Sequence, residues 1–402
     1  MADEGVPAPP WSRLRPLPVL FVVLLFGFLW WRSPQRHAAP AASAPTPTAL
    51  AGNEGPMGAV ERQSDVDCAL LAGRSMGAGW HATVVGVADA AQAQALAAAV
   101  QAVLDGVDAA MSTYKPESEL SRLNRSPVGA PQPVSRDLAA VLRIALEVSQ
   151  ASGYAFDVAV GGLVDAWGFG PSQPGAAPTG DAVKTLRQRV GPGAYTLQAP
   201  PDDPSGATLV RAREGVTLDL SAVAPGYAAD LIASDLRRRG HNAFLVEVGG
   251  EVIVAGLAPG GRPWQLGVET PDAPPGTVYK AVPMVDEALA TSGDYRNGRV
   301  VDGKRVSHTI DPATGQPITH GLASISVLHD DAGRADAWAT ALNVLGAERG
   351  GALARDLGIA AMFLLRKPDG GFEEQRTPAW EARQAQVQQR AQRYAAAPGA
   401  RP

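Results

Sequence analysis

The segment AFLVEVGGEVIVAG, residues 243–256, is expected to form two strands that are broken at Gly249 and Gly250. Short apolar runs on either side of a glycine pair are typical of strands joined by a turn. The pattern of the chain predicts further strands over residues 80–87, 215–221, 322–330 and 360–367, and helices over residues 90–112, 136–152, 225–240 and 335–346. Mixed strands and helices with hairpin-like breaks indicate an α+β domain.

The composition supports a sizeable core and excludes several classes of protein. Of the 402 residues, 46% are apolar and 19% are charged, so the chain is not wholly disordered. With a net charge of −5, the chain lacks the excess of basic residues that is typical of nucleic-acid-binding proteins. Cys68 is the single cysteine, which excludes an intrachain disulfide, a cysteine-rich metal site and an iron–sulfur cluster. The chain also lacks a GxGxxG fingerprint and a GxxxxGK[ST] loop, so neither a Rossmann nor a P-loop interpretation has support.

Residues 1–32 are expected to be a signal peptide or a membrane anchor. Arg13 and Arg15 precede an apolar run of about 15 residues that ends at Trp31. This length fits the core of a signal peptide and is short for a spanning helix, which needs roughly 20 residues. Trp30 and Trp31 at a membrane interface would favour an uncleaved anchor, whereas the small residues that follow would allow cleavage. Either alternative exports the rest of the chain.

Two further segments are poor in large apolar residues. Residues 33–66 are rich in Ala, Pro, Gly, Ser and Thr and are interpreted as a flexible linker. The predicted domain occupies residues 67–372. Residues 373–402 are expected to form a polar C-terminal tail, in which residues 379–396 favour a helix on propensity alone. Because the face of that helix is mostly Gln and Arg, it is interpreted as a solvated helix or as disorder.

Polar side chains that suit chemistry gather in loops and at the start of one helix. Asp336 and Thr340 have an i, i+4 spacing, so they share one face near a helix N-terminus. A carboxylate and a hydroxyl there suit Mg²⁺, although an acidic first-turn residue that stabilises the helix dipole is the simpler alternative. His308 lies between Ser307 and Thr309, before an Asp-Pro turn. For a lone histidine, a structural hydrogen-bonding role is the simpler alternative to catalysis.

Eight motifs, taken in their order along the chain, are more specific together than any one of them. They are GRSMGAGW, MSTYKPESELSRLN, SGYAFDVAVGGLVDAWGFG, LDLSAVAPGYAADLI, FLVEVGGEVIVAG, ALATSGDYRN, SHTIDPATGQPI and ADAWATALNVLG. In this order the chain resembles the FAD:protein FMN transferases, the ApbE family, over residues 73–366. The resemblance implies a single large α+β domain of mixed sheets and helices, with two T-fold-like halves as an option.

The resemblance also implies an activity. It implies a Mg²⁺-dependent reaction in which FAD is split at its pyrophosphate, FMN is attached to a Thr or Ser hydroxyl of a target protein, and AMP leaves. Phosphoryl chemistry of this kind needs charge neutralisation more than covalent help. The implied partners are FAD and an exported or membrane redox protein with a Thr/Ser flavinylation motif similar to SGAT. The implied location is the periplasmic side of a bacterial inner membrane, where the N-terminal segment would be the export signal or anchor.

Site residues follow from the same resemblance, motif by motif. It assigns FAD contacts to Met76, Tyr114, Ala155, Phe156, Asp157, Asp219, Pro225 and Ile310. It assigns the metal to Asp336, to Thr340 and to Ala222 through its backbone oxygen. A Thr hydroxyl is a poor nucleophile and needs a base or strong positioning, and either His308 or Asp294 would take its proton.

The chain departs from the family pattern at a few positions. Pro225 stands where relatives usually carry Lys or Glu, so a polar contact to FAD is lost. Ala339 stands where some relatives place a third acidic ligand, which would weaken the metal site. An active transferase is favoured. Two alternatives stay open, an FAD-binding protein without transferase activity and an FAD pyrophosphatase that yields free FMN and AMP.

Overall fold

The computed structural model describes residues 56–396, apart from residues 173–175, 199–205, 295–297 and 302–303. The expected export or anchor segment, residues 1–32, lies outside the described residues, as does most of the expected linker. Within the described part, no helix combines the length and the apolar character that crossing a membrane would need.

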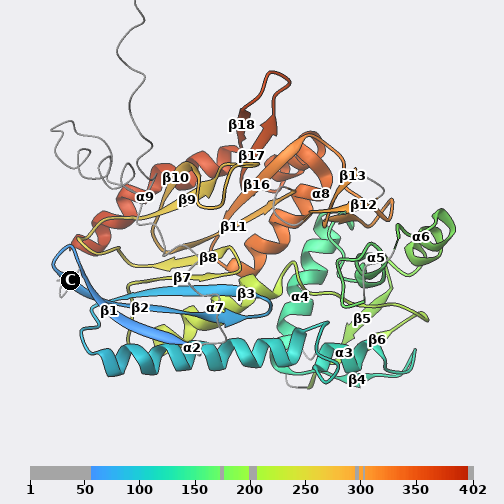
Figure 1. Cartoon of the computed structure of the whole chain (residues 1–402), viewed down its shortest axis with the longest axis horizontal. Coiled ribbons are helices and arrows are strands. Elements are labelled where there is room, and N and C mark those ends of the chain that lie inside the picture. Colours follow the sequence, from blue (N-terminus) through green and yellow to red (C-terminus); the bar gives the residue numbers. More distant parts are fainter. Residues whose placement is uncertain (1–55, 173–175, 199–205, 295–297, 302–303, 397–402) are drawn as a thin grey trace, which may run out of the picture. The chain divides into compact units, whose positions relative to one another are not determined.

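A nine-stranded sheet forms the centre of the domain (Figure 1), and its strands follow the order β1-β2-β3-β7-β8-β11-β16-β17-β18. The strands are β1 Met57–Gln63, β2 Val66–Ser75, β3 Ala78–Val85, β7 Phe244–Val248, β8 Glu251–Ala255, β11 Glu287–Gly293, β16 Leu322–His329, β17 Ala360–Arg366 and β18 Phe372–Arg376. Every neighbouring pair in this order is antiparallel. Strand β1 therefore belongs to the sheet, although it falls within the segment expected to be a linker.

Two tight turns at one end of this sheet matter for the site. Val248 pairs with Glu251, so Gly249 and Gly250 form a two-residue loop, with φ angles of 67° and 115°. The expected break between two strands is confirmed. Strands β2 and β3 are joined in the same way by Met76 and Gly77, with φ angles of 49° and 76°. A methionine with positive φ is uncommon. Such a conformation persists where the surroundings require it, often at a functional site.

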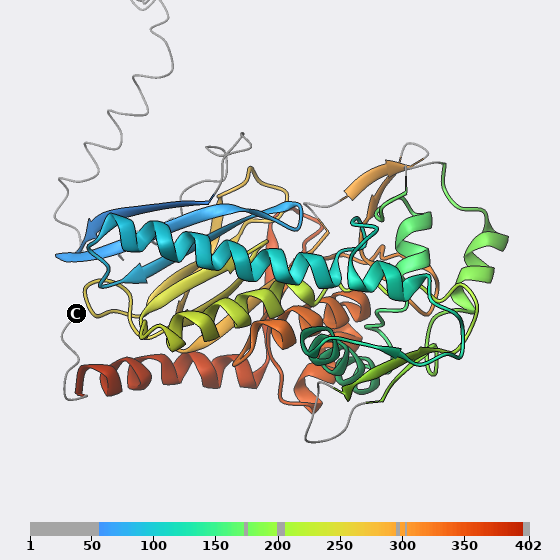
Figure 2. The same cartoon turned by 90° about the horizontal axis from the view of Figure 1, so that it is seen from below.

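Helices cover one face of the sheet, which confirms the α+β expectation. They are α2 Ala90–Met111, α4 Arg136–Ala151, α7 Ala224–Arg238 and α8 Ala332–Asp356. Figure 2 shows α2 and α7 side by side in front of the strands. Along β7, Phe244, Val246 and Val248 are buried in the core with these helices. Leu245 and Glu247 alternate with them and so point to the opposite face.

The opposite face is covered by the hairpin of β9 Trp264–Glu269 and β10 Val278–Met284 and by helix α9 Pro378–Ala396. The expectation that residues 379–396 form a helix is confirmed, but its interpretation as solvated or disordered is wrong. Trp380 and Val387 are each 1% exposed. Arg383 and Arg390 of α9 lie 3.5 and 3.2 Å from the buried carboxylate of Glu287 in β11. Apolar packing and ion pairing therefore hold α9 against the domain.

The remaining elements lie mostly beyond one end of the sheet. They are α3 Glu119–Asn124, α5 Gly161–Ala166, α6 Gly180–Arg187, the three-stranded sheet of β4 Gln132–Pro133, β5 Tyr195–Gln198 and β6 Thr208–Arg211, and the short pairs β12 Gly298–Val301 with β13 Lys304–Ser307 and β14 Ile310–Asp311 with β15 Gln316–Pro317.

The prediction of a strand over residues 215–221 is wrong. Thr217 forms only an isolated bridge with Val160, and the side chain of Asn124 bonds both the N–H and the carbonyl of Leu218 at 2.8 and 2.9 Å.

Replacement of Trp380 by Ala tests whether α9 is part of the folded domain. Because Trp380 is fully buried in the apolar cluster under the β9–β10 hairpin, Trp380→Ala should lower the free energy of unfolding by about 3–5 kcal/mol. Urea unfolding followed by circular dichroism measures this change. The matched control is Gln386→Ala on the exposed side of the same helix, expected within about 0.5 kcal/mol of the wild type. Equal stabilities for the two variants would contradict the docked helix.

Candidate active site

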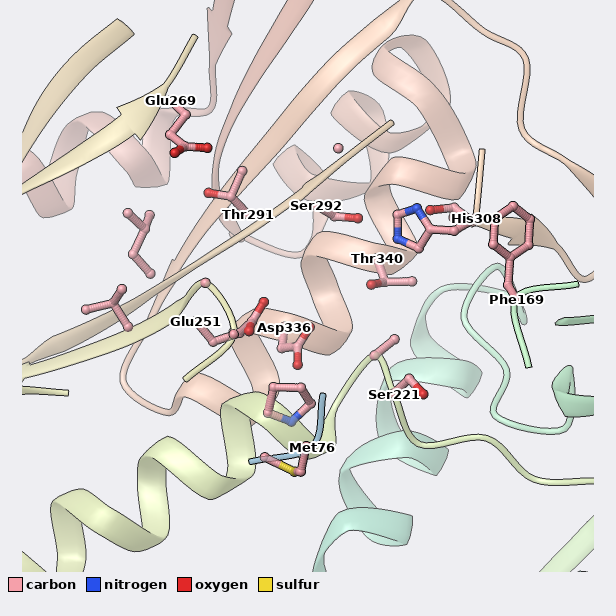
Figure 3. A pocket seen from close by; sticks show the side chains of 18 of the residues that line it. Met76, Phe169, Ser221, Glu251, Glu269, Thr291, Ser292, His308, Asp336 and Thr340 are labelled. Atoms are coloured by element: carbon pink, nitrogen blue, oxygen red, sulfur yellow. The ribbon is translucent and has the colours of Figure 1, made fainter. Parts of the chain in front are cut away.

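A cavity of about 1,100 Å³ is lined by side chains from both halves of the chain. All predicted FAD and metal positions line it, and so does His308. Asp294 is the exception, because it is absent from the lining formed by the described residues. Figure 3 shows Asp336 and Thr340 in the middle of this cavity, with Met76 below them and His308 to one side. The structure thus brings together residues that the sequence separates widely.

The first turns of helix α8 fix the position of Asp336. The carboxylate of Asp230, in α7, accepts hydrogen bonds from the N–H groups of Ala332 and Gly333 at 2.8 and 2.9 Å. This contact holds the N-terminus of α8 in the manner of a capping side chain. Gly226 permits the close approach of the two helices, since a Cβ there would lie 2.3 Å from the carbonyl oxygen of Ala332. The approach brings the first turn of α7 beside Asp336.

The Asp336 carboxylate is buried, with 7% of the residue exposed. Its Oδ2 accepts a hydrogen bond from the N–H of Gly226 at 3.3 Å. Burial raises the pKa of Asp336 to about 7, and the nearby carboxylate of Asp230 adds to this rise. A carboxylate in such a place is stabilised as an anion by a bound cation. Thr340 lies one turn further along α8 and lines the same cavity, as the i, i+4 spacing predicts.

Glu251 is a second carboxylate at this point, and the sequence analysis missed it. It follows the Gly249–Gly250 turn in β8 and lies beside Asp336 in Figure 3. Burial raises the pKa of Glu251 well above its usual value, and the Asp336 carboxylate raises it further. The only signal in the sequence was an acidic residue directly after a glycine turn. Its neighbour Asp336 belongs to a distant helix, so no local pattern could pair them.

The oxygen atoms around Asp336 fit a hard divalent cation such as Mg²⁺. Asp336, Thr340 and the backbone of Ala222 supply a carboxylate, a hydroxyl and a carbonyl oxygen, which are the donor types that Mg²⁺ prefers. No cluster of three or more His, Cys, Asp or Glu side chains suited to a metal occurs among the residues that the structure describes. A cation at this place therefore depends on the hydroxyl and the main-chain oxygen as well as on carboxylates.

The two predicted candidates for the base lie in different surroundings. His308 lines the cavity, and its ring contacts Phe169 edge-on, with 6.3 Å between the ring centroids. Both oxygens of Asp294 accept hydrogen bonds from Arg366, at 2.7 and 3.0 Å. Arg366 also pairs with Asp272, in the loop between β9 and β10. The geometry thus favours His308 for proton transfer and makes Asp294 an anchor between β11, β17 and that loop.

The aromatic residues and the AFD segment shape the side of the cavity near His308. Tyr114 is 64% exposed, and its hydroxyl donates to the carbonyl of Phe169 at 3.0 Å. Ala155 and Phe156 are buried and line the same cavity. The Asp157 carboxylate accepts hydrogen bonds from the N–H groups of Ala159 and Gly191, at 2.8 and 2.7 Å. It therefore holds the backbone of this loop in place.

Pro225 costs the fold little at its position. It lies in the first turn of α7, where a helix makes no use of the backbone N–H. Asp219 lines the cavity from the segment before that helix, and Ile310 lines it from β14 while packed against Trp167 and Leu163. The methyl group of Ala339, by contrast, is buried in the main core and does not belong to the cavity lining.

Asn343 is a further residue that the sequence analysis missed. It is fully buried in α8, and its Nδ2 donates to the hydroxyls of Ser292 and Thr309 at 3.1 and 3.4 Å. Its backbone carbonyl contacts the His320 ring at 2.7 Å. These bonds tie the end of β11 and the loop that carries His308 to the same helix as Asp336. No motif marked Asn343, because its role depends on contacts between distant segments.

Comparisons with known proteins agree with this geometry. The model of the ApbE family matches residues 76–363. The FAD:protein FMN transferase of Klebsiella pneumoniae is 38% identical over 303 residues, which cover 75% of this chain and 85% of the relative. The enzyme of the same name from Escherichia coli K12 is 35% identical over 314 residues, which cover 78% of this chain and 88% of the relative.

Two solved structures are similar over most of the chain. The flavin transferase ApbE from Vibrio cholerae has a TM-score of 0.70 and 34% identity, and covers 79% of this chain and 99% of its own. The apo form of the flavinyl transferase ApbE from Pseudomonas stutzeri has a TM-score of 0.69 and 34% identity, and covers 81% of this chain and 96% of its own. With its fold, its site and these matches, the chain belongs to the ApbE family.

Proposed function

We propose that this chain transfers FMN from FAD to a Thr or Ser hydroxyl of a target protein, with release of AMP. The observation that carries the proposal is a single cavity that joins the buried carboxylate of Asp336 and the hydroxyl of Thr340 to His308 and to the FAD positions. The relatives named FAD:protein FMN transferase support the same activity.

Each part of the site has a task in this reaction. Asp336, Thr340 and the backbone oxygen of Ala222 would hold Mg²⁺, and Glu251 lies next to them. Bound there, the cation supplies charge neutralisation at the pyrophosphate. Met76 and Tyr114 contact FAD, and the loop held by Asp157 shapes the side of the cavity that receives the adenosine.

His308 accepts the proton of the acceptor hydroxyl. A Thr or Ser hydroxyl is a weak nucleophile at neutral pH and needs a base within reach. The bonds that Asn343 makes to Ser292 and Thr309 hold the His308 loop against α8. The oxygen of the acceptor then forms a bond to the FMN phosphorus while the bond to the AMP phosphate breaks.

The location of the reaction is part of the proposal. Residues 1–32, as signal peptide or anchor, would place the domain on the periplasmic side of a bacterial inner membrane. The target would be an exported or membrane redox protein with a Thr or Ser in its flavinylation motif. The support for this step is the sequence pattern of residues 1–32, two arginines before an apolar run.

Mass spectrometry of an acceptor protein tests the activity. The full-length chain, incubated with FAD, Mg²⁺ and an acceptor domain that carries the sequence Ser-Gly-Ala-Thr, should give an FMN adduct and AMP. Asp336→Ala or EDTA should abolish the adduct, because charge neutralisation at the pyrophosphate is lost. Asp181→Ala is the matched control, since it removes an exposed carboxylate from the first turn of α6. Free FMN and AMP without an adduct would indicate a pyrophosphatase, and bound FAD without either product would indicate a binding protein.

A pair of substitutions separates the roles of His308 and Asp294. His308→Ala should lower the rate of adduct formation by about 10²- to 10⁴-fold, the usual contribution of a general base, and leave the dissociation constant of FAD close to that of the wild type. Asp294→Asn should mainly lower the melting temperature, because it weakens the pair with Arg366. An Asp294→Asn variant with unchanged melting temperature and the larger loss of rate would make Asp294 the base instead.

A further inference from the structure

The cavity extends from Asp336 and Thr340 in more than one direction, and one of these directions holds none of the predicted FAD contacts. Figure 3 shows Glu269 and Thr291 on one side and His308 and Phe169 on the other. The first side, here named the β9 groove, is lined by His81, Leu245, Glu247, Val252, Leu289 and the strand segment 265–269. None of these residues was assigned to FAD. The groove is continuous with the reaction site, because all of them line the same cavity.

Strand β9 presents an open edge to this groove. Within the described chain, β9 pairs only with β10, and the five consecutive residues 265–269 line the cavity. Side chains of a strand alternate between its two faces, so one face would contribute only every second residue to a cavity. Five consecutive residues indicate that the cavity borders the edge of the strand. Pro283 of β10 is opposite Gln265 and has no N–H to donate. Gln265 and, two residues later, Gly267 therefore direct their N–H and carbonyl groups away from β10 and toward the open edge.

The floor of the β9 groove is the face of the central sheet beside the hairpin. Leu245 and Val252 contribute apolar surface there, and Glu247 lies 3.6 Å from His81. The carboxylate of Glu247 gives this floor its negative charge. An open strand edge above a partly apolar, acidic floor is complementary to an extended peptide that carries basic residues.

We propose that the β9 groove binds an extended segment of the acceptor protein, which adds as a strand to the edge of β9. A Lys or Arg side chain of that segment faces Glu247, and its Thr or Ser reaches the junction of Thr291, Ser292 and Thr340. This inference rests on the proposed function and names how its protein substrate is recognised. Backbone pairing supplies affinity for many sequences, whereas the acidic floor selects among them.

The β9 groove also gives the acceptor hydroxyl a path to the phosphate. FAD occupies the side of the cavity near Tyr114 and Ile310, so the other side is the path left to the acceptor. In Figure 3 the His308 ring points toward Ser292 and Thr340 from across the junction. The hydroxyl proton passes to His308, the new bond joins the hydroxyl oxygen to the FMN phosphorus, and AMP carries away the electrons of the broken P–O bond. The transfer therefore needs no reactant other than FAD and the acceptor hydroxyl.

A scan of backbone methylation with the wild-type enzyme tests the strand pairing. The probes are synthetic peptides that carry Ser-Gly-Ala-Thr with Lys flanks, each methylated at one backbone nitrogen, and the readout is the FMN adduct. Strand addition predicts that methylation at every second position abolishes the adduct, while the positions between tolerate it. Uniform tolerance or uniform loss would overturn the proposal. Flavinylation of the whole acceptor domain without flavinylation of the unmethylated peptide would also contradict strand addition.

Substitutions at Gln265 test the same edge from the enzyme. Gln265→Pro removes one outward N–H and should raise KM for the Lys-flanked peptide about three- to tenfold, the worth of one hydrogen bond, with the dissociation constant of FAD unchanged. Gln265→Ala keeps the N–H and should behave as the wild type. Equal KM values for the two variants would contradict pairing at this edge. Failure of the wild type with every acceptor, while FAD still binds, would instead reject the proposed function.

A charge-reversed peptide tests the acidic floor. Glu flanks in place of Lys flanks should raise KM at low salt, and Glu247→Gln should reduce the difference between the two peptides, since it removes the carboxylate that faces the flank. A preference for the Glu-flanked peptide would overturn the assignment of a basic segment.

Discussion

The proximity of two carboxylates, the buried Asp336 and the partly buried Glu251, is the constraint on which the rest of the site depends. Burial raises the pKa of both groups, and the Asp336 carboxylate raises that of Glu251 further, so the pair is costly unless a cation or a proton compensates it. The fold nevertheless holds them together from two directions. Asp230 fixes the start of α8, and the Gly249–Gly250 turn brings Glu251 to the same place. This arrangement is expected at a metal-assisted reaction site rather than in a purely structural core.

The two faces of the sheet have different tasks. The helices on one face provide the large core and carry Asp336 and Thr340. The hairpin and α9 on the other face provide a wall beside the site. Lys280 of β10 pairs with Glu374 of β18, and Arg366 pairs with Asp272 in the hairpin loop. These contacts hold the open edge of β9 in one position, which strand addition requires because an ordered edge loses little entropy on binding.

Local motifs made much of the site predictable from the sequence. The i, i+4 spacing places Asp336 and Thr340 on one helix face, and the glycine pair predicts the β7–β8 turn. Glu251, Asn343 and the pairing of Asp294 with Arg366 were not predictable in this way, because each depends on contacts between distant segments. The strand expected over residues 215–221 failed for a related reason, since the side chain of Asn124 bonds the backbone at Leu218 in place of a neighbouring strand. In α9, Trp380 and Val387 are two turns apart, a signal that the many Gln and Arg residues obscured.

A crystal structure of the full-length chain with FAD and Mn²⁺, collected with anomalous scattering, would test the central claim most directly. The account predicts an anomalous peak bound by Asp336 and Thr340 and in contact with the pyrophosphate. It also predicts flavin density near Met76 and Tyr114, with no FAD density along β9. A metal peak away from Asp336, or FAD lying in the β9 groove, would contradict both the assigned reaction site and the path proposed for the acceptor.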